Sequence, residues 1–341
     1  MADTLTPARS SFAATTKRER LPWPAGKPFR ILSIDGGGIK GIYPAAVLAE
    51  IEAQVLDGQP VWPYFDLVTG TSTGGILALG LANGLTAREL RDLYCGDGKA
   101  VFAVGCWRRS LKWIRSWAMY MYSRKDLESL ATTAFKKARI RDSKVRLCIP
   151  SFEGRHSEVA ILRTPHHPTC TKLDASKTMV EVALSTSAAP LYFRPLDAGG
   201  YRYVDGGVWA NNPTMIGLIE ALTCFDIQPE QIRILSLGCG REPFRVGWFQ
   251  AIFGGLFAWR NIIFAAMHLQ SENARNQARL LVGPNNFVRL EPETVDPIKL
   301  DDWSRASCEL PPLAKKDLAP HLRTIQSLFF GEPADRPRFY F

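Results

Sequence analysis

The sequence predicts an α/β fold: a layered domain with a mostly parallel central sheet flanked by helices. Two observations indicate this fold class. Short apolar runs of strand length alternate with segments of helical periodicity, and several of the predicted strands end at glycine-rich turns. We expect a flexible N-terminal lead-in over 1–28, the main domain over 29–240, and a helical C-terminal extension over 241–341 that packs on the same domain.

The first predicted strand and helix flank a glycine-rich loop. Residues 29–34 form a short apolar run that leads directly into the segment Asp35-Gly36-Gly37-Gly38-Ile39-Lys40-Gly41. From Ile42 to Ile51, apolar residues recur at helical spacing. This stretch therefore predicts strand, glycine loop and helix in succession.

A second strand leads into a turn of small residues. We expect this strand over 64–68, and Gly70-Thr71-Ser72-Thr73-Gly74 follows it closely. The run 76–82 is apolar on nearly all sides, which predicts a buried helix that ends at Asn83-Gly84. Thr86 is placed to cap a further helix over 89–94.

The rest of the sheet is predicted from shorter runs. Strands are expected over 145–149, 158–162, 201–204 and 232–237, and a helix over 179–187. The strand that begins at Tyr201 runs into Asp205-Gly206-Gly207. From about residue 244 the pattern becomes helical, and after Pro292 it is rich in proline.

Composition limits the classes of partner and cofactor. Hydrophobic residues make up 46% of the 341 residues, so the chain can bury a sizeable core. The formal charge of +9 is spread along the chain, which favours an anionic partner such as a phospholipid surface, a nucleotide or a nucleic acid. The seven cysteines are scattered and include no C-x-x-C pair, which argues against a disulfide framework and against a metal site. Residues 1–20 lack the apolar core of a secretion signal, so we expect a cytoplasmic protein.

Two segments of the sequence bear on contact with a membrane. The apolar segment 246–268 is interrupted by Gln250, Arg260 and Asn261, so it does not qualify as a membrane span. Residues 107–127 have a basic, tryptophan-rich pattern with helical spacing, which includes Trp107, Arg108, Lys112, Trp113, Arg115 and Trp117. Two interpretations of this segment stay open: a helix at a lipid interface, or a helix packed on the core with a basic solvent face.

Ser72 is the candidate nucleophile. A G-x-S-x-G turn between a strand and a helix can hold its serine in a strained conformation that exposes the hydroxyl group. The helix that follows directs the positive end of its dipole toward this serine, which favours negative charge there. Taken alone, the motif also fits an ordinary glycine turn.

The segment Gly36–Gly41 is the candidate oxyanion hole. Glycine permits unusual backbone dihedrals and close approach, so the backbone N–H groups of such a loop can converge on an anion. The segment also fits G-x-G-x-x-G, but Glu50 and Glu52 lie in or near the next helix rather than at the end of a second strand. The P-loop pattern fails because Ile42 stands where a Lys-Ser/Thr pair is required. We therefore do not expect nucleotide hydrolysis at this loop.

Asp205 is the candidate general base. A conventional α/β-hydrolase carries serine, an acidic residue and histidine in that order, but only His268 and His321 follow Asp205, and neither falls in a strand-end loop. We therefore interpret the five histidines as structural or surface residues. Asp205 ends a strand before Gly206-Gly207, which leaves its carboxylate near the sheet edge where Ser72 is expected. A carboxylate within hydrogen-bond reach can itself act as a base, although a plain Asp-Gly turn fits the same residues.

Four separated motifs resemble the patatin-like phospholipase family in order and spacing: DGGGIKG, GTSTGG, the stretch SAAPLYF over Ser187–Phe193, and DGG. The resemblance covers residues 29 to 240 and implies a patatin-like catalytic domain with a Ser-Asp dyad that lacks histidine. By motif position it implies that Ser72 is the nucleophile, that Asp205 is the base, and that the amides of Gly37 and Gly38 form the oxyanion hole. The other motif positions are Gly36, Lys40 and Gly41 in the loop, Gly70 and Gly74 at the elbow, and Gly206 and Gly207 after the base.

The resemblance implies deacylation of membrane phospholipids by an enzyme of the phospholipase A type, acting peripherally at the membrane and without a cofactor. The chain is also similar to bacterial phospholipase effectors of antiphage signalling that cyclic nucleotides switch on, which implies a cyclic nucleotide activator. DNA and RNA are not expected as partners, and a homo-oligomer stays open. Two alternatives remain: a nucleotide- or lipid-sensing binding protein on a patatin fold, and a lipid acyltransferase that uses the same dyad.

Overall fold

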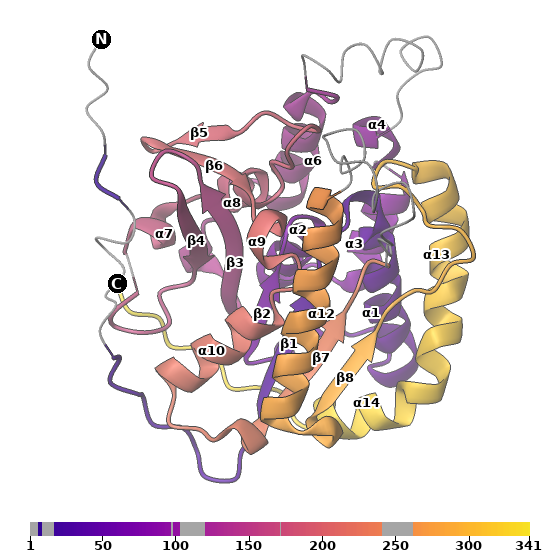
Figure 1. Ribbon diagram of the computed structural model, residues 1–341. Helices are drawn as coiled ribbons and strands as arrows, with labels where there is room; N and C mark the ends of the chain where they lie inside the picture. The colour runs from indigo at the N-terminus through magenta and orange to yellow at the C-terminus, as the bar shows by residue number, and fades with distance from the viewer. Residues whose placement is uncertain (1–5, 9–16, 97, 103–119, 171, 241–261) are drawn as a thin grey trace, which may run out of the picture.

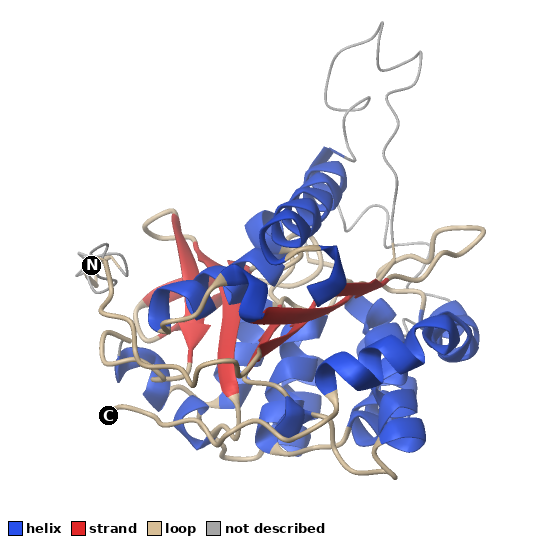
Figure 2. Ribbon diagram, turned by 90° about the horizontal axis from the view of Figure 1, so that it is seen from below, coloured by secondary structure: helices blue, strands red, loops and turns tan. Residues whose placement is uncertain are grey.

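A computed structural model describes residues 6–8, 17–96, 98–102, 120–170, 172–240 and 262–341. In these residues a central sheet lies between layers of helices (Figures 1 and 2). The helices are α1 (Ile42–Val55), α2 (Thr73–Asn83), α3 (Ala87–Gly96), α4 (Gly98–Phe102), α6 (Arg124–Phe135), α7 (Lys172–Ser176), α8 (Met179–Thr186), α9 (Gly207–Ala210), α10 (Thr214–Cys224), α12 (Ile262–Val282), α13 (Trp303–Leu318) and α14 (Leu322–Phe329). The predicted layered α/β class, with helices in the C-terminal part, is confirmed.

The sheet is mixed, with a parallel centre. Its strands are β1 (Phe29–Ile34), β2 (Leu67–Gly70), β3 (Arg146–Glu153), β4 (Glu158–Arg163), β5 (Leu196–Ala198), β6 (Tyr201–Asp205), β7 (Ile232–Leu237) and β8 (Phe287–Leu290). Their order is β5-β6-β3-β2-β1-β7-β8, with β4 paired to β3. The strands from β3 to β8 in this order run parallel, whereas β4 and β6 are antiparallel to β3, and β5 is antiparallel to β6. From β1 the chain continues to β2 on one side and reaches β7 later on the other side. The carboxyl end of β1 is therefore a switch point at which a crevice is expected.

Four strands differ from the sequence prediction by more than a residue: β5 was not predicted, β3 continues to Glu153 instead of ending at residue 149, and β2 and β8 differ as follows. The strand expected over 64–68 begins only at Leu67, because Trp62–Tyr64 forms a short 3-10 turn with a proline in its first positions. In the C-terminal part, β8 adds a parallel strand beside β7, so this extension is not helical throughout. A run of four residues is too short to give a clear period in the sequence.

Alternation along β1 assigns its side chains to the two helical layers. Leu32 and Ile34 pack in the same apolar cluster as residues of α1, α2, α3, α13 and α14. Phe29 and Ile31 pack on the other face with residues of α10 and α12. Because successive side chains of a strand point to opposite faces, Asp35 continues the face of Ile31.

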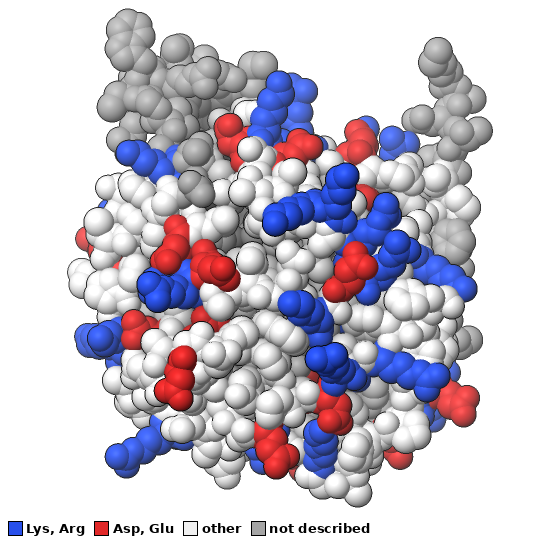
Figure 3. Space-filling view, turned by 180° about the vertical axis from the view of Figure 1, so that it is seen from behind, with Lys and Arg blue, Asp and Glu red and all other residues white. Residues whose placement is uncertain are grey.

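The described residues contain no helix that is long and apolar enough to cross a membrane. Of the segment 107–127, for which an interfacial helix was one interpretation, residues 107–119 lie outside the described residues. Figure 3 shows the face of the molecule opposite to that of Figure 1. Lys and Arg side chains are spread over this face with Asp and Glu between them, as the distribution of charge along the sequence indicates.

Candidate active site

Ser72 lies in a sharp turn between β2 and α2. Its φ of 54° and ψ of −120° are unusual for a residue with a side chain, so its backbone is strained. The turn closes only because small residues flank the serine: a Cβ atom on Gly74 would collide with the carbonyl oxygen of Ile34. The amide of Ser72 donates to Oγ1 of Thr186 at 3.0 Å, and this bond helps to hold the strained turn.

The hydroxyl group of Ser72 meets the carboxylate of Asp205. Oγ of Ser72 donates to Oδ2 of Asp205 at 2.7 Å, and Oδ1 of Asp205 accepts the amide of Gly207 at 2.7 Å. Asp205 is 4% exposed. Burial raises the pKa of its carboxyl group to about 6, although the two hydrogen bonds act in the opposite direction. This carboxylate is therefore more basic than an ordinary aspartate.

Strand register brings these two residues together. Thr69 of β2 pairs with Cys148 of β3, and Ser151, farther along β3, pairs with Asp205 at the end of β6. Ser72 follows Thr69 by as many residues as Ser151 follows Cys148. Because β3 extends beyond the end of β2, Asp205 reaches the level of Ser72 even though β6 is antiparallel to β3.

Two amides of the glycine loop lack an acceptor among the described residues, and the two that flank them are paired. The amide of Gly36 donates to the carbonyl of Asn211 at 3.0 Å, and that of Ile39 donates to the carbonyl of Leu300 at 2.9 Å. Between them, the amides of Gly37 and Gly38 have no hydrogen-bond acceptor within the ranges of residues described above. Gly38 has a φ of 58°, and a Cβ atom there would lie 2.5 Å from the carbonyl oxygen of Leu300, so glycine is required. Two free amides next to a hydroxyl group can bind an oxyanion.

The remaining residues of the motifs fit around this arrangement. A Cβ atom on Gly36 would lie 3.5 Å from Cβ of Ser72, so the glycine loop and the elbow are neighbours. Cβ atoms on Gly41, Gly70 and Gly206 would collide with Thr73, Gly74 and Pro150 respectively, so these three glycines permit close backbone packing. Lys40, within the loop, is buried.

An apolar cavity of about 160 Å³ opens next to the Ser72–Asp205 pair. Ser72, Asp205 and the glycine loop lie on its wall. Most of the remaining wall is apolar, and this apolar part comes mainly from α2, α4, α6, α9 and the segment after α8: Ile76, Val101, Leu127, Leu130, Pro190, Leu191, Tyr192, Phe193 and Val208. Residues of α12 add Met267, His268, Ser271 and Glu272. A cavity of this composition suits a hydrocarbon chain better than a polar substrate.

No histidine completes a triad. All five histidines belong to the described residues, and none of them is hydrogen-bonded to Ser72 or Asp205. His268 of α12 does line the cavity, which the sequence did not predict. His166, by contrast, is buried away from the cavity and bonds to Glu220 at 3.1 Å.

One group of described residues has the spacing of metal ligands. Potential ligand atoms of Cys148, His166 and Glu220 lie within 4.8 Å of one another. Glu220, however, already accepts Arg163 at 2.8 Å and Arg18 at 3.0 Å. Burial alone would raise the pKa of Glu220, but Arg163 and its other partners hold it below the ordinary value. A cation would have to displace these two guanidinium groups, so we interpret the group as an ion-pair network.

Sequence reasoning missed two residues beside the pair. Thr186, which accepts the amide of Ser72, directly precedes the SAAPLYF stretch. Asn211 follows the DGG motif closely, and its amide nitrogen donates to Oγ of Ser271 at 3.1 Å. Its Oδ1 atom is buried without a hydrogen-bond partner in the described structure, and it faces Gly36. Their closeness in sequence to recognised motifs was the available signal.

A strand-end serine beside a buried carboxylate, free loop amides and an apolar cavity define the class of lipid ester hydrolases. The model of the family described as patatin-like phospholipase matches residues 32–218. The chain belongs to this family and is an enzyme of the patatin-like phospholipase type. The family predicted from the sequence motifs is thereby confirmed.

Similar proteins include bacterial enzymes. The chain is 34% identical over 316 residues to a cGAMP-activated phospholipase of Vibrio cholerae, and this match covers 82% of this chain and 86% of that protein. It is 32% identical over 275 residues to a cGAMP-activated phospholipase of Pseudomonas aeruginosa, and this match covers 80% of each chain. Among solved structures, VipD from Legionella pneumophila aligns with a TM-score of 0.42 and 14% identity, over 89% of this chain and 70% of that one.

Proposed function

We propose that this enzyme deacylates membrane phospholipids with a dyad of Ser72 and Asp205. The observation that carries the proposal is the 2.7 Å hydrogen bond from Oγ of Ser72 to Oδ2 of Asp205, at the wall of an apolar cavity. The raised pKa of Asp205, about 6, supports its role as a base that works near neutral pH.

The proposed reaction has two steps. As Oγ of Ser72 attacks the ester carbonyl carbon, Asp205 accepts the hydroxyl proton, and the amides of Gly37 and Gly38 donate to the oxyanion. The tetrahedral intermediate then collapses, and the lysolipid alcohol leaves with the proton from Asp205. In the second step a water molecule gives a proton to Asp205 and attacks the acyl-enzyme. The intermediate then collapses, Asp205 returns the proton to Oγ of Ser72, and the fatty acid is released.

The proposed substrate is a phospholipid in a membrane, and the enzyme acts from the membrane surface. The apolar wall of the cavity suits the acyl chain, and the charge of +9 favours an anionic surface. The family supports the same substrate class, since its members are described as phospholipases.

We further propose that a cyclic nucleotide switches the enzyme on, as part of a bacterial defence against phage. The support is the relatives named cGAMP-activated phospholipase, which are 32% and 34% identical over at least 80% of the chain. A ligand of this kind raises activity if it binds the active conformation more tightly than the inactive one.

A product assay tests these proposals. Purified enzyme is incubated with vesicles of phosphatidylethanolamine and phosphatidylglycerol of defined acyl composition, with and without cGAMP, and the products are identified by mass spectrometry. We expect free fatty acid and lysophospholipid, more of both with cGAMP, and neither with the Ser72→Ala variant.

Other outcomes contradict particular parts of the proposal. Hydrolysis that persists in Ser72→Ala contradicts the assignment of Ser72 and Asp205 as the catalytic dyad. Acyl transfer to an added lysolipid, with little free fatty acid, would identify a lipid acyltransferase. Binding of lipid or cGAMP without any turnover would identify a sensing protein. If cGAMP leaves the rate unchanged, and other cyclic dinucleotides also leave it unchanged, activation by cyclic nucleotides is contradicted.

A further inference from the structure

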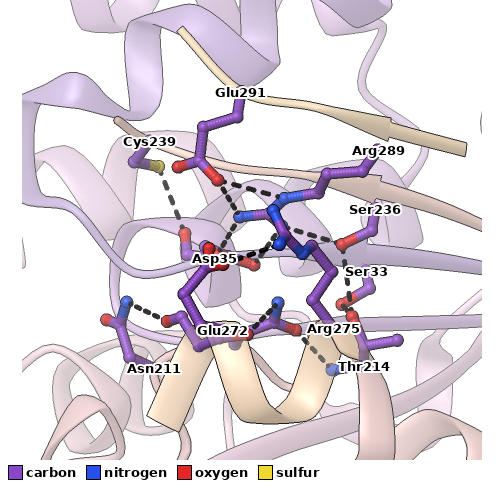
Figure 4. Close-up of polar contacts among 12 residues, drawn as sticks. Ser33, Asp35, Asn211, Thr214, Ser236, Cys239, Glu272, Arg275, Arg289 and Glu291 are labelled. Atoms are coloured by element: carbon purple, nitrogen blue, oxygen red, sulfur yellow. Dashed lines mark hydrogen bonds and ion pairs between the residues drawn. The ribbon is translucent and has the colours of Figure 1, made fainter. Parts of the chain in front are cut away.

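A buried polar network lies beside the glycine loop, on the sheet face that α10 and α12 cover (Figure 4). Ser33 and Asp35 continue the face of Ile31, because side chains alternate along β1. Ser236 of β7 and Arg289 of β8 are register partners and add to the same face. This face is therefore apolar near the start of the strands and polar near their carboxyl ends, where the cavity lies.

Arg289 is the centre of this network. Its guanidinium donates to both carboxylate oxygens of Asp35, at 3.0 and 2.7 Å, to Oε2 of Glu291 at 2.6 Å, and to Oγ of Ser236 at 2.8 Å. Burial opposes the charge of Arg289, but the carboxylates of Asp35 and Glu291 raise its pKa above the ordinary value. Loss of Arg289 would leave the two buried carboxylates of Asp35 and Glu291 without this counter-charge.

The network holds the glycine loop from two sides. Asp35 directly precedes the loop, and its carbonyl oxygen accepts the thiol of Cys239 at 3.3 Å. A Cβ atom on Gly37 would collide with Cys239, so the segment after β7 packs directly against the loop. Glu291 holds this same segment, because its Oε1 accepts the amide of Gly240 at 3.2 Å.

We propose that Arg289 is a positioning residue of the hydrolytic reaction, which holds the amides of Gly37 and Gly38 in the geometry that an oxyanion requires. Arg289 is hydrogen-bonded to neither Ser72 nor Asp205, so it acts through the loop. Loss of one oxyanion donor typically costs ~100-fold to ~1,000-fold in kcat, and a misplacement of ~1 Å can cost ~100-fold. The inference rests on the proposed function, since it assigns the two amides to the oxyanion.

Arg163 provides a matched control within the chain. Its side chain is 16% exposed, compared with 10% for Arg289, and it donates to both carboxylate oxygens of Glu220 at 2.9 and 2.8 Å. Neither Arg163 nor Glu220 lines the cavity. Removal of Arg163 therefore breaks a comparable buried ion pair without affecting the glycine loop.

The test uses the full-length chain and a soluble short-chain ester. For Arg289→Ala we expect kcat to fall ~100-fold while KM changes less than ~2-fold, because a transition-state interaction is lost. Arg289→Lys should lose less, since one ammonium group keeps the charge but not the paired bonds. Arg163→Ala should keep the wild-type kcat although its Tm falls. Guanidinium chloride, well below denaturing concentrations, should restore part of kcat in Arg289→Ala.

The inference and the proposed function fail in different ways. A wild-type kcat in Arg289→Ala, when Ser72→Ala is inactive, overturns the role of Arg289 and leaves the dyad standing. Activity that persists in Ser72→Ala overturns the proposed function itself. If Arg289→Ala does not fold, Arg289→Lys and Glu291→Gln carry the test: reduced kcat at unchanged KM in both supports the role, and wild-type kcat in both contradicts it.

Discussion

The rate of ester hydrolysis should rise with pH through about 6, because Asp205 accepts a proton only when it is ionised. Burial raises the pKa of this carboxyl group to about 6 in the folded enzyme. Below this pH, Asp205 carries a proton and the hydroxyl group of Ser72 lacks its base. Above it, the carboxylate is free to act, and the rate should reach a plateau.

The size of the change follows from the pKa. With a pKa of about 6, roughly one tenth of the enzyme is ionised at pH 5 and roughly nine tenths at pH 7. We therefore expect kcat/KM for a soluble ester to rise about 10-fold between these values. An aspartate with the ordinary pKa of about 3.9 would be almost fully ionised at both, and the rate would change by only about 1.1-fold.

The assay must separate Asp205 from a second buried carboxyl group. Burial also raises the pKa of Asp35, against the effect of Arg289, and Asp35 lies on the wall of the same cavity. Hydrolysis of a soluble short-chain ester is followed from pH 4.5 to 8, with circular dichroism at each pH to confirm the fold. In Asp35→Asn the rate should be lower, but the midpoint should stay near 6. A flat profile between pH 5 and 7, or a midpoint that vanishes in Asp35→Asn, refutes the assignment to Asp205.

Three further predictions concern the residues around the nucleophile. Ser72→Ala and Asp205→Asn should each abolish nearly all hydrolysis, and the double variant should be no worse than the single ones, which steady-state kinetics will show. Thr186→Val should lower kcat ~10-fold by releasing the amide of Ser72, whereas Thr186→Ser should retain most activity in the same assay. Gly38→Ala should lower both kcat and Tm, because alanine is strained at a φ of 58° and its Cβ atom meets Leu300; thermal melts and kinetics check this.

Much of the fold could be predicted from short motifs that mark where strands end. The strand before Asp35 and the strand before Ser72 are apolar runs that lead into glycine-rich turns, and in a parallel sheet such ends share one edge. The position of Asp205 beside Ser72 depends instead on strand pairing. Its strand is antiparallel to β3, and it reaches Ser72 only because β3 extends past β2. Strand length and register depend on tertiary pairing, so the local sequence contained no sign of them.

The support of the glycine loop could not be predicted in this way. Arg289 lies in a strand of four residues, and its partner Asp35 lies near the other end of the chain. Periodicity shows which side chains share a face, but it does not show which buried charges form pairs. The same holds for Oδ1 of Asn211, which has no hydrogen-bond partner among the described residues and whose surroundings come from the glycine loop and α12.

The two parts of the candidate site are held by different regions of the chain. Ser72 and Asp205 depend on β2, β3, β6 and Thr186, all of which lie before residue 206. The glycine loop depends in addition on contacts from β8 and Leu300, which lie beyond residue 280. Looser packing of the C-terminal region should therefore displace the oxyanion donors before it separates the serine from its base. An enzyme in that condition would keep the hydrogen bond between Ser72 and Asp205 and still hydrolyse esters slowly.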